Sequence, residues 1–306
     1  MIDFVGKRYW FFLISAILII SGIISLGVFG LKWGVDFSSG TAITLQFEKE
    51  VELGQLRQEL ADLGYDSATI QPADKGEFFI RLQEISSDEY TQLKEGLAVG
   101  LATNITDSSL FTVSPIIAAA TVRNTAIAVI IASIGILLYI SWAFRKMPKP
   151  IRWGTCAVLA LLHDLVIVIA IFSILGWAAG MEVDALFVTG VLAVVGVSVN
   201  NIVVVFDRIR ENLKRGVSSD FEVVANCGIM ESVGRSLNTG LATLFVIVAL
   251  YLLGGVTIRN LILALLVGIT TGIYSSLCIA GQLLVVWDKG EWGKLFSWLP
   301  FAKRAA

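Results

Sequence analysis

Side chains that hold metal ions or carry out redox chemistry are scarce in this sequence, which has one histidine and three cysteines among 306 residues. Cys156, Cys227 and Cys278 lie far apart, in two apolar stretches and one loop. Their spacing indicates neither a disulfide framework nor a metal site. We therefore expect no metal, no cofactor and no redox role, and we expect no nucleic-acid partner.

Charged side chains are also scarce, at 16% of the residues, whereas 56% are hydrophobic and the mean hydropathy is +0.79. Soluble domains carry about 25% charged residues. Five long stretches lack charge altogether, namely residues 9–31, 124–144, 185–206, 236–258 and 260–287. A sixth apolar stretch, from residue 151 to about 180, is interrupted only by Arg152 and Asp164. Each stretch can cross ~30 Å of hydrocarbon at ~1.5 Å per residue, so the sequence predicts six transmembrane helices.

The distribution of charge predicts the orientation, although the net charge of -2 does not. Lysine and arginine gather before the first helix, between the second and third, after the fourth and in the C-terminal tail, whereas the short loops opposite carry only Arg259. Basic loops stay on the cytoplasmic side of a membrane. We therefore expect a multi-pass membrane protein with both termini in the cytoplasm.

The stretch from Lys32 to about Arg123 is then exported, and it holds 14 acidic residues against seven basic ones. Residues 41–47 alternate like a strand, leucines follow at helical spacing, and residues 68–73 and 77–83 are predicted as two more strands around a "DKG" turn. A capping box at Ser86 and Glu89 opens a second helix, and "SSLFTVSP" supplies a last strand. The order β-α-β-β-α-β predicts a ferredoxin-like α+β domain, a docking module more readily than an enzyme.

These observations divide the chain into nine segments, which alternate between the membrane and its two sides. We expect an N-terminus with helix 1 (1–31), an exported α+β domain (32–122), helix 2 (123–144), helix 3 (151–178), helix 4 (184–206), a cytoplasmic amphipathic segment (207–234), helix 5 (235–254), helix 6 (260–287) and a cytoplasmic tail (288–306).

A few polar groups lie at membrane depth, where a charge costs roughly 2.5 to 3.5 kcal/mol on insertion scales. The third apolar stretch holds His163 beside Asp164, and the fourth holds Asn200 and Asn201. The two asparagines could bond neighbouring helices together, or they could line a polar seam that passes a proton or a conformational signal. Because an asparagine does not titrate, any proton carrier on such a seam must lie elsewhere.

Each candidate proton carrier has a structural alternative. His163 and Asp164 form one ionisable pair that serves either proton coupling or packing. Arg235 opens the fifth helix, where its side chain could simply reach the headgroups. Asp207 and Arg210 are three residues apart and Glu211 and Arg215 four apart, which favours ion pairs along a charged helix face.

Four motifs resemble the SecD/SecF family of bacterial protein export, and its SecF-type subunits in particular. They are "GVDFSSGT" (34–41), "HDLVIVIAIFSILG" (163–176), "GVSVNNIVVVFDRIREN" (196–212) and "SVGRSLNTGLATLFVIVALYLLGG" (232–255). The resemblance implies a six-helix bundle of the RND superfamily that pairs with SecD beside the SecYEG channel. It also implies use of the proton-motive force to draw preproteins across the membrane, with YajC and YidC as further partners.

The resemblance also implies roles for single residues. Arg235 matches a fifth-helix arginine implicated in proton coupling, and Asp36 and Gly40 belong to the motif that leads into the exported domain, where we expect a hinge. Two residues depart from the family pattern. Ser39 stands where glycine is usual, and Asn201 stands where many relatives have aspartate. A proton would then use a carboxylate of the partner subunit, or Asp164.

Two rival functions fit parts of the same sequence. A small-molecule RND exporter usually joins two six-helix halves with large exported domains, which this chain lacks. A structural scaffold would need the amides and Asp164 only for packing. We therefore expect a non-enzymatic transport subunit, and the proton-coupling candidates are His163, Asp164, Asn200, Asn201, Asp207 and Arg235.

Overall fold

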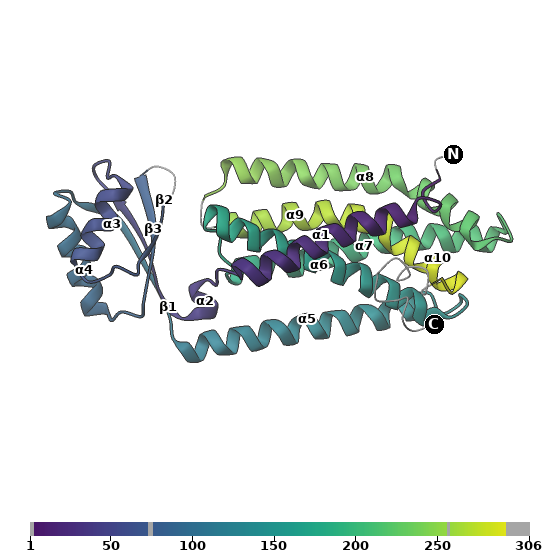
Figure 1. The fold of residues 1–306 in the computed structure, drawn as a ribbon, viewed down its shortest axis with the longest axis horizontal. Coiled ribbons are helices and arrows are strands. Elements are labelled where there is room, and N and C mark those ends of the chain that lie inside the picture. Colours follow the sequence, from purple (N-terminus) through teal and green to yellow (C-terminus); the bar gives the residue numbers. More distant parts are fainter. Residues whose placement is uncertain (1–2, 73–75, 256–257, 292–306) are drawn as a thin grey trace.

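The computed structural model describes residues 3–72, 76–255 and 258–291. Figure 1 shows two parts, a small sheet domain at one end and a bundle of long helices at the other. The expected "DKG" turn includes residues 74–75, and the expected tail includes residues 292–306. Both therefore lie partly outside the described residues.

The sheet domain has the predicted order β-α-β-β-α-β. Its elements, which follow the short helix α2 (Val35–Ser38), are β1 (Gly40–Phe47), α3 (Leu53–Asp62), β2 (Thr69–Pro72), β3 (Glu77–Leu82), α4 (Ser87–Gly100) and β4 (Ile105–Val113). The strands lie in the order β2-β3-β1-β4 with antiparallel neighbours. Because β3 lies between β1 and β2, the first three strands form the split βαβ unit of a ferredoxin-like fold, as predicted.

Alternating apolar residues build the core of this domain. Ile43, Leu45 and Phe47 of β1 point to one face of the sheet, where Leu56 of α3 and Leu97 of α4 cover them. The predicted capping box is present at the start of α4, since Ser86 Oγ accepts a hydrogen bond from Glu89 N–H and the Glu89 carboxylate accepts one from Ser86 N–H.

Among the described residues, six helices are long and apolar enough to cross a membrane. They are α1 (Arg8–Phe29), α5 (Pro115–Ala143), α6 (Pro150–Ala179), α7 (Ala185–Arg215), α8 (Phe221–Leu253) and the continuous run of α9 (Arg259–Ser275), a π-helical turn (Ser276–Ala280) and α10 (Gly281–Lys289). The prediction of a helical membrane protein with six spans and a small sheet domain between the first two spans is confirmed.

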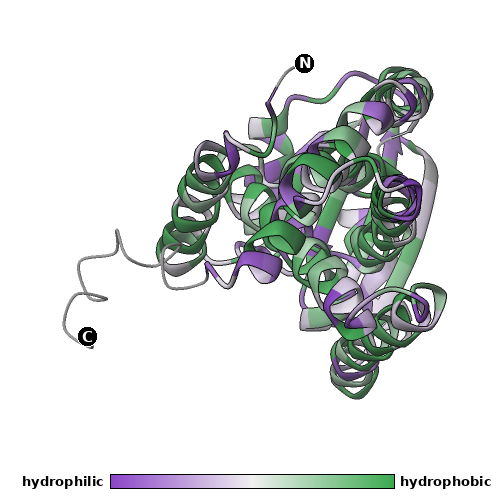
Figure 2. Ribbon diagram, turned by 90° about the vertical axis from the view of Figure 1, so that its right-hand side faces the viewer, coloured by the Kyte–Doolittle hydropathy of each residue, from purple (hydrophilic) through white to green (hydrophobic). Residues whose placement is uncertain are grey.

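Helices α6, α7 and α9 form the centre of the bundle, and α1, α5 and α8 lie outside them. Glycines allow close packing at the centre, where Gly268 of α9 lies against Val194 of α7 and Gly272 against Ser198. The outer helices expose mostly apolar side chains, which Figure 2 shows in green around the rim of the bundle. Such a surface is suited to lipid or to another apolar chain.

Three helix ends differ by more than two residues from the predicted segment limits. Helix α5 begins at Pro115, ahead of residue 123, because Pro115 suits the first turn of a helix and the polar residues that follow do not stop it. Helix α7 continues to Arg215, and α8 already begins at Phe221 with Asp220 as its N-cap. The expected amphipathic segment is therefore the tip of a helical hairpin.

Candidate functional site: a buried polar network

The His163–Asp164 pair lies inside the bundle, on α6. The ring Nδ1 of His163 is 3.1 Å from Asp164 Oδ1, and Asp164 is only 1% exposed. The other carboxylate oxygen, Oδ2, accepts hydrogen bonds from Ser198 Oγ of α7 at 3.0 Å and from Ser275 Oγ of α9 at 2.7 Å. One carboxylate thus joins the three central helices.

The network extends to the outer helix α1 through the second ring nitrogen of His163. The ring Nε2 of His163 is 2.9 Å from Ser15 Oγ, which in turn lies 3.2 Å from the hydroxyl of Tyr274. That hydroxyl donates a hydrogen bond to the backbone carbonyl of Phe11 at 2.9 Å. A continuous chain of polar groups therefore runs from α1 through α6 to α7 and α9.

The local backbone of the sixth span is irregular beside the network. Ser275 ends α9, and the next five residues form a π-helical turn whose side chains are all buried. In such a turn the backbone hydrogen bonds join residues five apart, one more than in an α-helix, and π-helical turns occur often at functional sites. Here the turn follows directly after the two residues, Tyr274 and Ser275, that bond to the network.

The arrangement can hold and redistribute one proton. With Asp164 ionised and His163 neutral, Nδ1–H donates to the carboxylate and Nε2 accepts from Ser15. Protonation of Asp164 turns one of its oxygens into a donor, so the hydrogen bonds with His163, Ser198 or Ser275 must rearrange. Because those partners lie on different helices, a change of protonation at Asp164 alters contacts between helices.

The two asparagines of α7 have different surroundings. Asn201 is buried at 4% exposure, on the same side of the helix as Ser198, whereas Asn200 is exposed. Neither side chain forms a hydrogen bond with another helix among the residues that the structure describes. The structure therefore places Asn201 near the network without joining it, and it places Asn200 on the outer surface of the chain.

Arg235 lies in the middle of α8 with its side chain exposed. Within the described ranges it forms no ion pair or hydrogen bond, and Asn238 and Thr239 are exposed beside it. Positions three and four apart share one face of a helix. Helix α8 thus presents a polar patch on an otherwise apolar outer face.

Asp207 is separate from the network. It pairs with Arg210 one turn further along α7, and Glu211 pairs with Arg215, as the sequence spacing predicts. Nine residues of helix, about 13 Å, separate Asp207 from Ser198.

Asp36 lies where the sheet domain meets the bundle. Its Oδ2 accepts a hydrogen bond from the backbone N–H of Ala185 at 2.9 Å, at the N-terminus of α7. Asp184 caps the same helix through Phe187 N–H and accepts a hydrogen bond from Asn260. Burial raises the pKa of the Asp184 carboxyl, and these two hydrogen bonds oppose the rise. Two carboxylates thus occupy the positive end of α7.

Gly40 begins β1 at a position that only glycine fits. Its φ is +127°, and a Cβ there would lie 2.6 Å from the carbonyl oxygen of Leu82. Gly40 therefore allows β1 to pack closely against β3 directly after the α2 turn. Asp36 and Gly40 are thus part of the junction between the membrane helices and the sheet.

The sequence predicted His163 and Asp164 as a pair, and it did not predict which four hydroxyl residues join them. Ser15, Tyr274 and Ser275 are ordinary residues in apolar stretches, and no motif distinguishes them. A weak signal exists, because each hydroxyl lies at membrane depth and needs a partner there. Which hydroxyls meet Asp164 depends on how the helices pack.

Comparisons with known proteins identify the family. Residues 94–290 match the family described as protein export membrane protein SecD/SecF, C-terminal, and residues 24–51 match the SecD/SecF GG motif. The chain is 41% identical to protein translocase subunit SecF of Thermobaculum terrenum and 37% identical to that of Anaerolinea thermophila, in each case over 97% of both chains. The chain belongs to the SecD/SecF family.

Two solved structures of SecDF share this family fold. The crystal structure of SecDF from Thermus thermophilus, described as a translocon-associated membrane protein, matches with a TM-score of 0.82 at 32% identity over 94% of the present chain. SecDF in a super-membrane-facing form matches with a TM-score of 0.68 at 30% identity over 97% of the chain. The chain spans about two fifths of the length of these SecDF chains, which it covers to 39% and 40%.

Membership in the SecD/SecF family confirms the resemblance predicted from the four motifs. The GG-motif match includes Asp36 and Gly40, with Ser39 at the position before Gly40. The C-terminal match includes His163, Asp164 and Arg235. As a member of this family with six apolar helices, the chain is a multi-pass membrane protein.

Proposed function

We propose that the chain, as an accessory subunit of Sec protein export, acts with a SecD subunit to use the proton-motive force in preprotein translocation through the SecYEG channel. The full-length similarity to translocase subunits named SecF supports the export role. The single-chain SecDF of Bacillus subtilis, 33% identical over 94% of the present chain, supports the pairing with SecD. YajC and YidC are further proposed neighbours.

The buried network around Asp164 is the observation on which proton coupling depends. Asp164 is 1% exposed and is bonded to His163, Ser198 and Ser275, which come from the three central helices. A proton that arrives at this carboxylate changes hydrogen bonds on all three helices at once. Titratable groups inside a membrane bundle are costly and commonly belong to a proton or ion pathway.

The exposed polar patch of α8 supports a partner inside the membrane. The apolar part of α8 begins directly after Arg235, and an exposed arginine at this boundary becomes favourable in the membrane when another subunit supplies a carboxylate. Arg235, Asn238 and Thr239 are therefore proposed to face SecD. Asn201 stands where many relatives have aspartate, and we propose that SecD supplies the missing carboxylate. Asn200 is proposed to lie on the same interface.

The proposed location is the bacterial plasma membrane with both termini in the cytoplasm. Helix α1 begins and α10 ends at the end of the bundle away from the sheet domain (Figure 1). The basic residues Arg145, Lys146, Arg208 and Lys214 lie in segments at the ends of α5 and α7, and basic segments remain cytoplasmic. The sheet domain would then lie on the exported side.

Depletion of the chain followed by pulse-chase of secreted proteins tests the export role. We expect precursors to accumulate, and we expect the difference from undepleted cells to shrink when an ionophore removes the proton-motive force. Secretion kinetics that do not change on depletion would refute the proposed function.

The role of Arg235 is tested by Arg235→Ala, with Arg57→Ala as the matched control. Arg57 is an exposed arginine of α3, in the sheet domain. We expect Arg235→Ala to slow export while membrane insertion and co-purification with SecD persist, and Arg57→Ala to export normally. Normal export by Arg235→Ala would remove Arg235 from the coupling pathway.

A further inference from the structure

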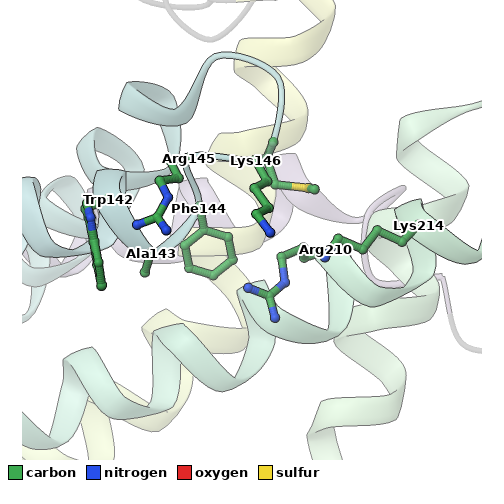
Figure 3. A pocket seen from close by; sticks show the side chains of 8 residues that line it. Trp142, Ala143, Phe144, Arg145, Lys146, Arg210 and Lys214 are labelled. Carbon is green, nitrogen blue, oxygen red and sulfur yellow. The ribbon is translucent and has the colours of Figure 1, made fainter.

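A basic pocket lies between the end of α5 and the last turns of α7. It has a volume of about 270 Å³ and is lined by Trp142, Ala143, Phe144, Arg145, Lys146, Met147, Arg210 and Lys214. Figure 3 shows that Arg145 and Lys146 reach it from the turn after α5, and that Arg210 and Lys214 reach it from α7. None of the lining residues belongs to the Asp164 network, and the proposed export role does not explain the pocket.

The pocket contains more positive than negative charge. Of its four cations, only Arg210 has an acidic partner among the described residues, namely Asp207. The guanidinium of Arg145 lies over the Trp142 ring at 4.6 Å, and that of Arg210 lies over the Phe144 ring at 5.4 Å. The aromatic rings hold these two cations in place. They leave available for an anion the N–H groups of Arg145 and those of Arg210 that do not contact Asp207.

The surroundings of the pocket combine this charge with an apolar surface. Trp142 is 63% exposed, and the preceding residues Leu138 and Tyr139 of α5 are also more than half exposed. An exposed tryptophan and tyrosine above a run of apolar side chains is typical of a helix that leaves the hydrocarbon region at the headgroup level. A ligand bound in this pocket would therefore contact both an anion-binding site and the apolar face of α5.

We propose that this pocket binds the phosphate headgroup of an anionic phospholipid. The headgroup phosphodiester would accept hydrogen bonds from Arg145 and Arg210, with Lys146 and Lys214 as additional cations, and the acyl chains would lie along the exposed face of α5. Basic pockets between membrane helices suit anionic headgroups. The volume is below the ~300 to 1,000 Å³ of typical small-molecule sites, which suits a headgroup whose chains remain outside.

A lipid explains the site better than the other anions that share its chemistry. Inorganic phosphate would use the cations and leave the apolar face of α5 without a role. An acidic protein segment would likewise contact the cations and leave the apolar face of α5 without a role. Only an amphiphile with an anionic head uses both the four cations and the exposed apolar surface that begins at Trp142.

Native mass spectrometry of the full chain in detergent tests the proposal with phosphatidylglycerol, phosphatidylcholine and inorganic phosphate as probes. The test variant is Arg145→Gln/Lys146→Gln. The control is Arg208→Gln/Arg215→Gln, which removes two cations of α7 that do not line the pocket. We expect the full chain to prefer phosphatidylglycerol, and the test variant to bind it about 30-fold more weakly, at about 1 kcal/mol per cation.

The control should retain the binding of the unaltered chain, and inorganic phosphate in large excess should not displace the lipid. Equal binding of phosphatidylglycerol and phosphatidylcholine would overturn the proposal. Equal loss in the test variant and the control would assign the effect to overall charge. Displacement by phosphate, or by a polyglutamate peptide at the concentration of the lipid, would assign the pocket to that anion instead.

Discussion

At the scale of single residues, Ser39 adopts a backbone conformation that glycine adopts almost alone, with φ 64° and ψ 166°. A side chain in this region costs on the order of 1 to 3 kcal/mol. We therefore expect Ser39→Gly to raise the free energy of unfolding by about 1 kcal/mol, the gain being reduced by the greater freedom of glycine in the unfolded chain. Thermal unfolding of the detergent-solubilised chain measures the change.

The adjacent glycine gives the opposite expectation and serves as the comparison. Gly40→Ala would place a Cβ against the Leu82 carbonyl at a φ of +127°, so we expect a loss of about 2 kcal/mol. If Ser39→Gly destabilises the chain or Gly40→Ala leaves it unchanged, the strain assigned to this junction is wrong.

Part of the candidate site was predictable at this scale. His163 and Asp164 are conspicuous because a histidine and a carboxylate interrupt an apolar stretch, where ionisable groups are costly. Ser15 and Ser275 were not predictable, because serine is common in membrane helices and their bonds depend on which helices meet. That Asn200 is exposed and Asn201 buried also depends on packing, since both follow the same valine-rich pattern.

At the scale of elements, the capping box of α4 gives a prediction for the sheet domain. Ser86 Oγ accepts the Glu89 N–H at 3.3 Å, so Ser86→Ala leaves that donor without its partner. We expect a loss of about 1 kcal/mol, which is typical of an N-cap serine. Amide hydrogen exchange in the first turn of α4 should become faster, and Ser38→Ala, which removes a serine hydroxyl outside this helix, should leave it unchanged.

The same capping box predicts a dependence on pH. The hydrogen bond from Ser86 N–H is the main cause that lowers the pKa of Glu89 below its ordinary 4.5. A carboxyl whose pKa is lower in the folded state stabilises the fold above its ordinary pKa, and this contribution is lost as the pH falls through the lowered value. We expect protection of the first turn of α4 to be constant near neutral pH and to fall below pH 4.5. The variant Glu89→Gln should lose this dependence on pH. If its protection falls with pH as in the unaltered chain, Glu89 is not the cause.

The order of elements was predictable, whereas some of their ends were not. Hydrophobic periodicity in residues 41–113 and the long apolar stretches gave the strands and helices in the observed order. The start of α5 at Pro115 was not predicted. The charged helix expected directly after residue 206 is present as the last turns of α7, which ends at Arg215. Apolar composition marks the part of a helix that lies in lipid, and a helix can extend beyond lipid wherever caps and ion pairs support it.

At the scale of the whole molecule, the sheet domain is attached to the bundle by a few polar contacts. Arg81 of β3 pairs with Glu182 in the loop between α6 and α7, and it donates a hydrogen bond to the carbonyl of Trp33 at 2.7 Å. Gln71 of β2 donates to the carbonyl of Gly180 at 2.7 Å. Burial lowers the pKa of Arg81 to about 10, so its guanidinium remains charged at neutral pH.

We expect Arg81→Ala to loosen this junction. Removing one member of a largely buried pair costs about 3 kcal/mol, since Glu182 would remain buried without its partner. Amide hydrogen exchange of residues 180–184 should become faster in Arg81→Ala and remain unchanged in Arg57→Ala. Equal exchange in both variants would show that the domain is held by other contacts.

The central claim concerns Asp164 as the group that couples protons to export. Asp164→Asn retains an oxygen for Ser198 and Ser275 and a polar group for His163, but it does not titrate. Ser173→Ala is the matched control, because Ser173 is a buried residue of α6 whose hydroxyl bonds to α1 without a titratable partner.

The most direct measurement is pulse-chase of a secreted protein, with and without an ionophore, in cells that carry either variant at the same membrane level as the unaltered chain. We predict that Ser173→Ala retains acceleration of export by the proton-motive force. We predict that Asp164→Asn exports at the rate that the unaltered chain shows under the ionophore. An Asp164→Asn variant that retains the full acceleration would contradict the account.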